Sequence, residues 1–189
     1  MLLVTLALYH RDSLSHGSSR RIFGYEAYHW GLLFTPTSAI PAAAAAPLYS
    51  FDATDASDID PVTFRLGNPS MDWWLRAETR PAPNPKLLGQ LIVGTLPSDD
   101  DNLAGGDGGW FGRLEAVLEE VPLPEKNTHP QQSCVTWAVA AVGRMQAQGW
   151  VPAFDLQVFK DAALAYADAR LKEDAAEPAL KEYRAEERL

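Results

Sequence analysis

The sequence predicts an α+β domain in which an antiparallel sheet packs against helices. The first half of the chain contains short apolar runs rich in β-branched and aromatic residues, separated by turn residues such as Gly and Pro. The second half contains longer segments whose apolar residues recur at helical spacing. Strands that precede helices, instead of alternating with them, are typical of the α+β class.

Six runs are predicted to be strands, and the residues between them are predicted to be loops. We expect the second and third runs to pair as a hairpin around a long variable loop at 35–47, because prolines flank its alanine run. The polar, Ser-rich stretch 11–21 and the acidic, Gly-rich stretch 98–109 are predicted to be loops as well. The predicted strands are 4–9, 28–34, 48–54, 63–66, 72–78 and 87–96.

Three amphipathic segments are predicted to be helices. In the first, apolar residues from Phe111 to Val121 share one face. The second begins near Cys134 and ends near Gly149, a residue type that commonly stops helices. The third begins near Asp155. We expect these helices to cover the sheet and to bury its apolar face.

The length and composition suit one domain. The chain has 189 residues, of which 47% are hydrophobic, and this is enough for an ordinary core. We expect this domain over 1–171. Residues 172–189 are charged and are interrupted by Pro178, so we expect a charged C-terminal tail that is a solvated helix or a frayed end.

Charge and cysteine content exclude several function classes. A formal net charge of −9 argues against a nucleic-acid surface, which needs clustered Lys and Arg. The single cysteine rules out an internal disulfide framework and a Cys-rich zinc site, and it fits a reducing compartment. Neither a P-loop nor an EF-hand pattern is present, so no metal and no cofactor are expected.

The apolar run at 1–9 is expected to be the first strand. It lacks the basic region of a signal peptide, and His10 and Arg11 follow where small residues would mark a cleavage site. No apolar stretch approaches the roughly 20 residues that span a bilayer. We therefore expect a cytoplasmic protein without a transmembrane segment.

Cys134 is the candidate nucleophile, because it stands where a polar loop enters an apolar helix. The N-terminus of a helix presents unpaired N–H groups and the positive end of the helix dipole, and both favour a thiolate. Free cysteines are also common in cores, so a buried structural thiol remains the alternative.

His29 is the candidate base. It opens the aromatic, apolar strand 28–34, where an imidazole would be held rigidly, as a proton acceptor must be. The other histidines have weaker positions in polar segments or at a strand end. They are His10, His16 and His129.

Asp52 is the candidate third residue. It lies on the strand expected to pair with the strand of His29, and it shares a face with Ser50. A carboxylate there would orient the imidazole and select its tautomer. The alternative is that Asp52 only ends its strand.

The order of these motifs resembles circularly permuted members of the papain-like NlpC/P60 superfamily, and the lecithin:retinol acyltransferase-like group is the nearest named comparison. The residues that carry the resemblance are the His-plus-aromatic run 28–33 and the Cys-plus-helix run 133–137. The chain also resembles an uncharacterised fungal family over most of 1–170. Its motifs here are Tyr28-His29-Trp30, Phe51-Asp52-Ala53-Thr54, Leu87-Leu88-Gly89 and Cys134-Val135-Thr136-Trp137.

The resemblance implies a permuted papain-like fold and a cysteine-dependent hydrolase or acyltransferase. Cys134 would attack an acyl or amide carbonyl of a small-molecule, peptidyl or acyl substrate, and His29 would move the proton. The candidates for the oxyanion hole and substrate contacts are Gln132, Ser133, Trp30 and Trp137, with the backbone N–H of Cys134.

A non-catalytic binding or scaffold protein that retains the fold is the other expectation. Many permuted relatives have Asn before the cysteine, and this chain has Ser133 there. Trp137 is also expected among the core and interface aromatics of the chain.

Overall fold

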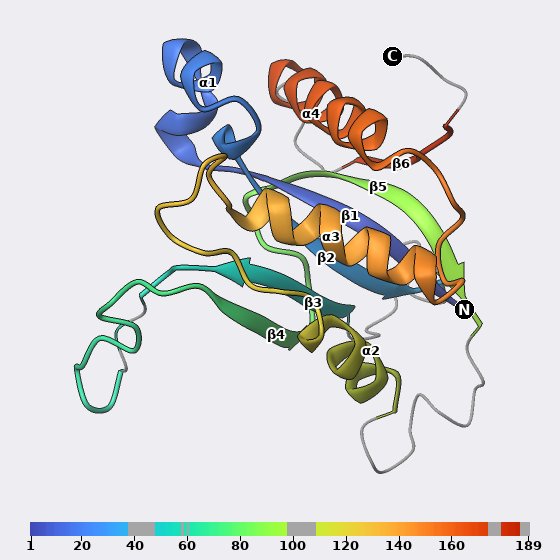
Figure 1. Cartoon of the computed structure of the whole chain (residues 1–189), viewed down its shortest axis with the longest axis horizontal. Coiled ribbons are helices and arrows are strands. Elements are labelled where there is room, and N and C mark those ends of the chain that lie inside the picture. Colours follow the sequence, from blue (N-terminus) through green and yellow to red (C-terminus); the bar gives the residue numbers. More distant parts are fainter. Residues whose placement is uncertain (38–47, 58, 60, 98–108, 174–178, 186–189) are drawn as a thin grey trace.

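The computed structural model describes residues 1–37, 48–57, 59, 61–97, 109–173 and 179–185 (Figure 1). Within these ranges the chain forms strands, short 3-10 helices (η) and α-helices in the following order: β1 Leu2–His10, η1 Asp12–Ser15, α1 Gly17–Phe23, η2 Gly24–Ala27, β2 Tyr28–Pro36, β3 Leu48–Thr54, β4 Trp74–Arg80, β5 Leu87–Leu96, α2 Gly109–Glu119, α3 Cys134–Ala147, α4 Leu156–Lys172 and β6 Ala179–Glu182.

The strands form one sheet in the order β4-β3-β2-β1-β5-β6. All neighbours are antiparallel except β5 and β6, which are parallel. β1 lies near the middle and is buried along most of its length, as its continuous apolar sequence favours. This central position makes β1 the frame on which β2 and β5 are aligned.

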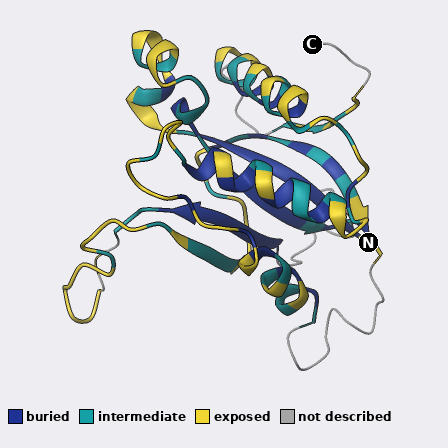
Figure 2. Cartoon of the chain, in the orientation of Figure 1, coloured by how far each residue is buried: buried dark blue, intermediate teal, exposed yellow. Residues whose placement is uncertain are grey.

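Helices cover one face of the sheet, and α3 runs across this face (Figure 1). Dark blue buried residues follow the central strands, whereas α3 and α4 show yellow, exposed residues on their outer sides (Figure 2). Alternate strand residues point to the helices and join the main core, among them Leu6, Leu8, Trp30, Leu32 and Phe51. The residues between them point to the opposite face, where a small cluster contains Ala7, Tyr9, Leu33, Leu48 and Leu87.

Helix α3 begins at Cys134 because its neighbours form a capping box. The Ser133 Oγ accepts a hydrogen bond from the Val135 N–H at 3.2 Å, and the Thr136 hydroxyl accepts one from the Ser133 N–H at 3.2 Å. The chain leaves the helix through Gly149, whose φ of +72° favours glycine. These local signals fix Cys134 at the first helical position.

The predicted α+β class is confirmed, as is the hairpin of β2 and β3. The predicted strand at 63–66 is wrong: only an isolated bridge joins Ile59 and Leu66 there. The predicted loop at 11–21 also needs correction, because it contains η1 and most of α1. Of the predicted loops at 35–47 and 98–109, residues 38–47 and 98–108 lie outside the described residues.

The expectation for the tail was also wrong at 179–182, which form β6 and not a solvated helix or a frayed end. Tertiary contacts hold this strand. The Tyr166 hydroxyl donates a hydrogen bond to the Ala179 carbonyl at 2.8 Å, and the Tyr183 N–H donates to the Ile92 carbonyl at 2.9 Å. The Tyr183 ring also packs edge-on against Phe159. The backbone partner Ile92 lies far from the tail in sequence, so the local composition of the tail does not reveal this strand.

No helix among the described residues is both long enough and apolar enough to cross a membrane.

Gly89 of β5 gives a test of how α4 and β6 are packed. A Cβ added at this position would lie 2.5 Å from the Tyr166 hydroxyl, the group that holds Ala179. We expect Gly89→Ala to lower the free energy of unfolding by about 1–3 kcal/mol, measured by urea denaturation. The matched control is Gly112→Ala in α2, where nothing lies within 4 Å. It should be neutral or raise stability by up to about 1 kcal/mol, and equal effects of the two substitutions would contradict this packing.

Candidate active site

The site lies where β2 and β3 separate. The two strands pair only between Leu32 and Phe34 on β2 and between Tyr49 and Phe51 on β3. His29 and Asp52 lie just beyond this paired region. A Cβ added to Gly31 would be 3.0 Å from the Asp52 Cβ, so glycine there lets Asp52 come close to β2.

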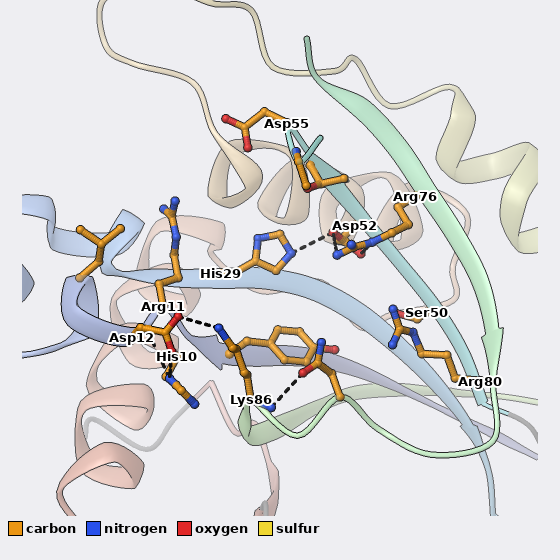
Figure 3. Close-up of a pocket in the computed structure, with 15 residues that line it drawn as sticks. His10, Arg11, Asp12, His29, Ser50, Asp52, Asp55, Arg76, Arg80 and Lys86 are labelled. Carbon is orange, nitrogen blue, oxygen red and sulfur yellow. Dashed lines mark hydrogen bonds and ion pairs between the residues drawn. The ribbon is translucent and has the colours of Figure 1, made fainter. Parts of the chain in front are cut away.

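His29 and Asp52 are joined by a hydrogen bond between Nε2 and Oδ2 of 2.9 Å (Figure 3). The imidazole also lies beside the ring of Tyr9, with 5.9 Å between the ring centroids. The side chain of His29 is 24% exposed, whereas that of Asp52 is only 5% exposed. The carboxylate therefore fixes the ring from the protein side, and one edge of the ring still reaches the surface.

Arg76 of β4 holds the other side of Asp52. Its Nε lies 3.1 Å from Oδ1 and its Nη2 lies 2.8 Å from Oδ2, which is a two-point contact (Figure 3). Burial by itself would raise the pKa of Asp52, but the hydrogen bond and charge of His29, together with Arg76, hold this pKa below its ordinary value. Asp52 is therefore a carboxylate at neutral pH.

Cys134 approaches the same imidazole from the N-terminus of α3. It lies close enough to His29 to raise the pKa of the imidazole. Because Asp52 occupies Nε2, the nitrogen left for the sulfur is Nδ1. The first N–H groups of a helix have no intrahelical partner, so they add positive potential around the sulfur. Sequence positions 29, 52 and 134 thus converge on one ring.

The protonation of His29 follows from these neighbours. Burial disfavours the imidazolium, but the nearby Cys134 and the hydrogen bond to Asp52 outweigh it and raise the pKa of His29 to about 10. His29 is therefore protonated at neutral pH. An imidazolium is the counter-ion that a thiolate requires.

The other predicted site residues have structural partners. Ser133 caps α3, and its hydroxyl lies 3.4 Å from the Glu26 carboxylate. The side-chain oxygen of Gln132 accepts a hydrogen bond from the Glu125 N–H at 2.8 Å. Trp30 and Trp137 are 0% and 1% exposed in the main core. The two tryptophans therefore pack the site from inside and do not line the pocket described below.

The remaining histidines have other surroundings, although His10 lines the same pocket as His29. His16 precedes α1 and His129 lies in the loop before α3, and both are exposed. His10 is 3.7 Å from Asp12, measured from Nδ1 to Oδ1. Sequence reasoning therefore selected the histidine that contacts both Asp52 and Cys134.

An open pocket of about 420 Å³ borders the site on the sheet face opposite α3. Its wall includes His29, Asp52 and Arg76, and also Tyr9 and Arg80. Cys134 is 2% exposed and is not part of this wall. The pocket therefore borders the imidazole and does not border the thiol.

Sequence reasoning missed Arg76, Tyr9 and Arg80. Alternation along β4 puts Arg76 and Arg80 on one face, but only the pairing of β3 with β4 places Arg76 opposite Asp52. Tyr9 pairs with His29 across β1 and β2. Among the described residues, no group of three or more His, Cys, Asp or Glu side chains could hold a metal ion.

No family model, curated protein or solved structure matches this chain. The geometry of the site therefore carries the functional argument.

The raised pKa of His29 predicts how stability changes with pH. A group whose pKa is higher in the folded than in the unfolded state stabilises the folded protein. This contribution is complete at pH values below the pKa of the unfolded state, near 6.5, and it is lost as the pH rises towards the pKa of the folded state, about 10. We expect the free energy of unfolding to fall over this interval, and to fall less in His29→Gln. Urea denaturation across the interval measures it. Parallel pH profiles for the two proteins would contradict the assignment.

Proposed function

We propose that this chain is a cysteine-dependent hydrolase or acyltransferase with a circularly permuted papain-like arrangement. The observation that carries the proposal is a single imidazole that interacts with the Cys134 sulfur and, through Nε2, with Asp52 at 2.9 Å. A nucleophile, a base and a group that orients the base are the parts that acyl transfer through a thiol requires.

The proposed chemistry uses Cys134 as the nucleophile and His29 as the group that moves protons. The thiolate of Cys134 attacks the carbonyl carbon of an acyl or amide substrate, and the backbone N–H of Cys134 stabilises the oxyanion. The imidazolium of His29 donates its proton to the leaving group, which departs and leaves a thioester. Neutral His29 then takes a proton from water, whose oxygen bonds to the thioester carbonyl carbon while the C–S bond breaks and the Cys134 thiolate leaves; this gives hydrolysis. An alcohol or amine in place of water gives transfer. Asp52 holds the ring through both steps.

The order of the elements supports the permuted comparison. The strands that carry His29 and Asp52 precede the helix that begins at Cys134. A single cysteine and a net charge of −9 fit a cytoplasmic enzyme with a small-molecule, peptidyl or acyl substrate, and they do not fit a nucleic-acid partner.

A non-catalytic binding protein is the second candidate. The observation that favours it is the burial of Cys134, which is 2% exposed and absent from the pocket wall. A thiol that a substrate never reaches would serve packing only. The two candidates therefore differ in whether the thiol reacts in the folded protein.

Alkylation by iodoacetamide gives the test, because Cys134 is the only cysteine. We expect the folded wild-type protein to be alkylated near neutral pH. Intact-mass spectrometry measures the rate of this reaction. His29→Gln should slow alkylation by about tenfold or more, because the thiolate loses its counter-ion. The matched control is the exposed His16→Gln, which should not change the rate. On a verified substrate, Cys134→Ala should abolish turnover. A thiol that reacts only after unfolding would leave the binding-protein candidate.

The residues that hold His29 in place should affect thiol reactivity less than His29 itself does. Asp52→Asn and Arg76→Gln should each slow alkylation less than His29→Gln does, because they disturb the orientation and charge of the ring without removing it. Both should also shift the pH profile of alkylation, since Asp52 no longer holds His29 as an imidazolium. Arg21→Gln removes an exposed arginine in α1 and serves as the control. Unchanged profiles in both site variants would contradict this role of Asp52 and Arg76.

A further inference from the structure

The pocket beside His29 has two ends that differ in charge. Arg80 lies at one end of β4, paired with Leu48. Asp55 follows the opposite end of β3, next to Thr54, which pairs with Trp74. Six residue steps along a strand separate these ends by about 20 Å. Figure 3 likewise shows Arg80 beside Ser50 and away from Asp55.

Two other carboxylates of the pocket wall, Asp52 and Asp12, already have cationic partners. Asp52 is held by His29 and Arg76. Asp12 accepts a 2.6 Å hydrogen bond from Lys86 Nζ (Figure 3). Neither carboxylate therefore leaves an unmatched negative charge to repel an anion.

Arg80 retains hydrogen-bonding capacity. Its Nη2 forms an ion pair with Glu78. Its Nε is buried and has no hydrogen-bond partner among the described residues. A guanidinium carries several N–H donors in a fixed plane, so one ion pair does not use them all.

Tyr9 supplies a second donor at the same end. Its hydroxyl lies close enough to Ser50 and Arg80 for both to affect its pKa, and all three residues line the pocket. Burial and the charge of Asp52 hold the pKa of Tyr9 above its ordinary value, so the hydroxyl stays protonated at neutral pH. A neutral hydroxyl beside a guanidinium suits an oxyanion and does not suit a cation.

We propose that the end of this pocket formed by Arg80 and Tyr9 binds an oxyanion group, either a carboxylate or a phosphate. The pocket also contacts His29, so such a group is either the anionic part of an acyl substrate or a separate anion bound next to the site. This proposal goes beyond the thiol chemistry and does not require Cys134 to be a nucleophile.

The first experiment measures binding of inorganic phosphate by NMR of protein with ¹³C-labelled tyrosine. We expect a saturable shift of the Tyr9 signal in wild type, an affinity about tenfold weaker in Arg80→Gln, and no change in the exposed-arginine control Arg21→Gln. Arg80→Lys keeps the positive charge and should retain part of the affinity. It also keeps the test informative if Arg80→Gln folds poorly.

The second experiment identifies the source of the oxyanion. Iodoacetate and iodoacetamide are nearly isosteric, and only iodoacetate is anionic. If the site receives the anionic part of a substrate, Arg80→Gln should lower the ratio of iodoacetate to iodoacetamide reactivity at Cys134 several-fold. If the site receives a separate anion, the ratio stays constant and phosphate binding still weakens. Both outcomes support an oxyanion site.

Two results would overturn the proposal: no saturable phosphate shift in wild type, or equal affinities in wild type and Arg80→Gln. Cys134→Ala separates this proposal from the catalytic one. This variant should bind phosphate like wild type. Loss of thiol chemistry would therefore not contradict the oxyanion site, and absence of phosphate binding would not contradict the thiol chemistry.

Discussion

The site depends on the nearly buried carboxylate of Asp52. Removing a carboxylate from water is costly unless partners replace its hydration. His29 on one side and Arg76 on the other supply this replacement at 2.8–3.1 Å. The contact joins three adjacent strands, so the same interaction orders the sheet edge and fixes the imidazole. Gly31 permits it, because a side chain there would push Asp52 away.

Helix α3 adds the sulfur to this frame. Ser133 and Thr136 close a capping box, which determines that the first helical residue is Cys134. The apolar side of α3 then packs on β2 and β3, and this packing brings the helix N-terminus to the point where the two strands separate. A local signal thus sets which residue begins the helix, and core packing sets where that residue lies.

The two faces of the sheet at the site have different properties. On the helix side the thiol is enclosed by core residues that include Trp30 and Trp137. On the opposite side His29 and Asp52 border an open, polar pocket with Arg80 and Tyr9. The imidazole is the element that faces both environments.

The sequence alone determined the α+β class, most strands and the start of α3, and it pointed to His29, Asp52 and Cys134 as candidates, because these follow from alternation, capping and local polarity. Tertiary structure alone decided the role of Arg76, the strand β6 and the burial of the thiol. Arg76 meets Asp52 through the pairing of β3 and β4. Strand β6 exists because β5 and Tyr166 offer it partners. Such partners are distant in sequence, so no local pattern encodes them.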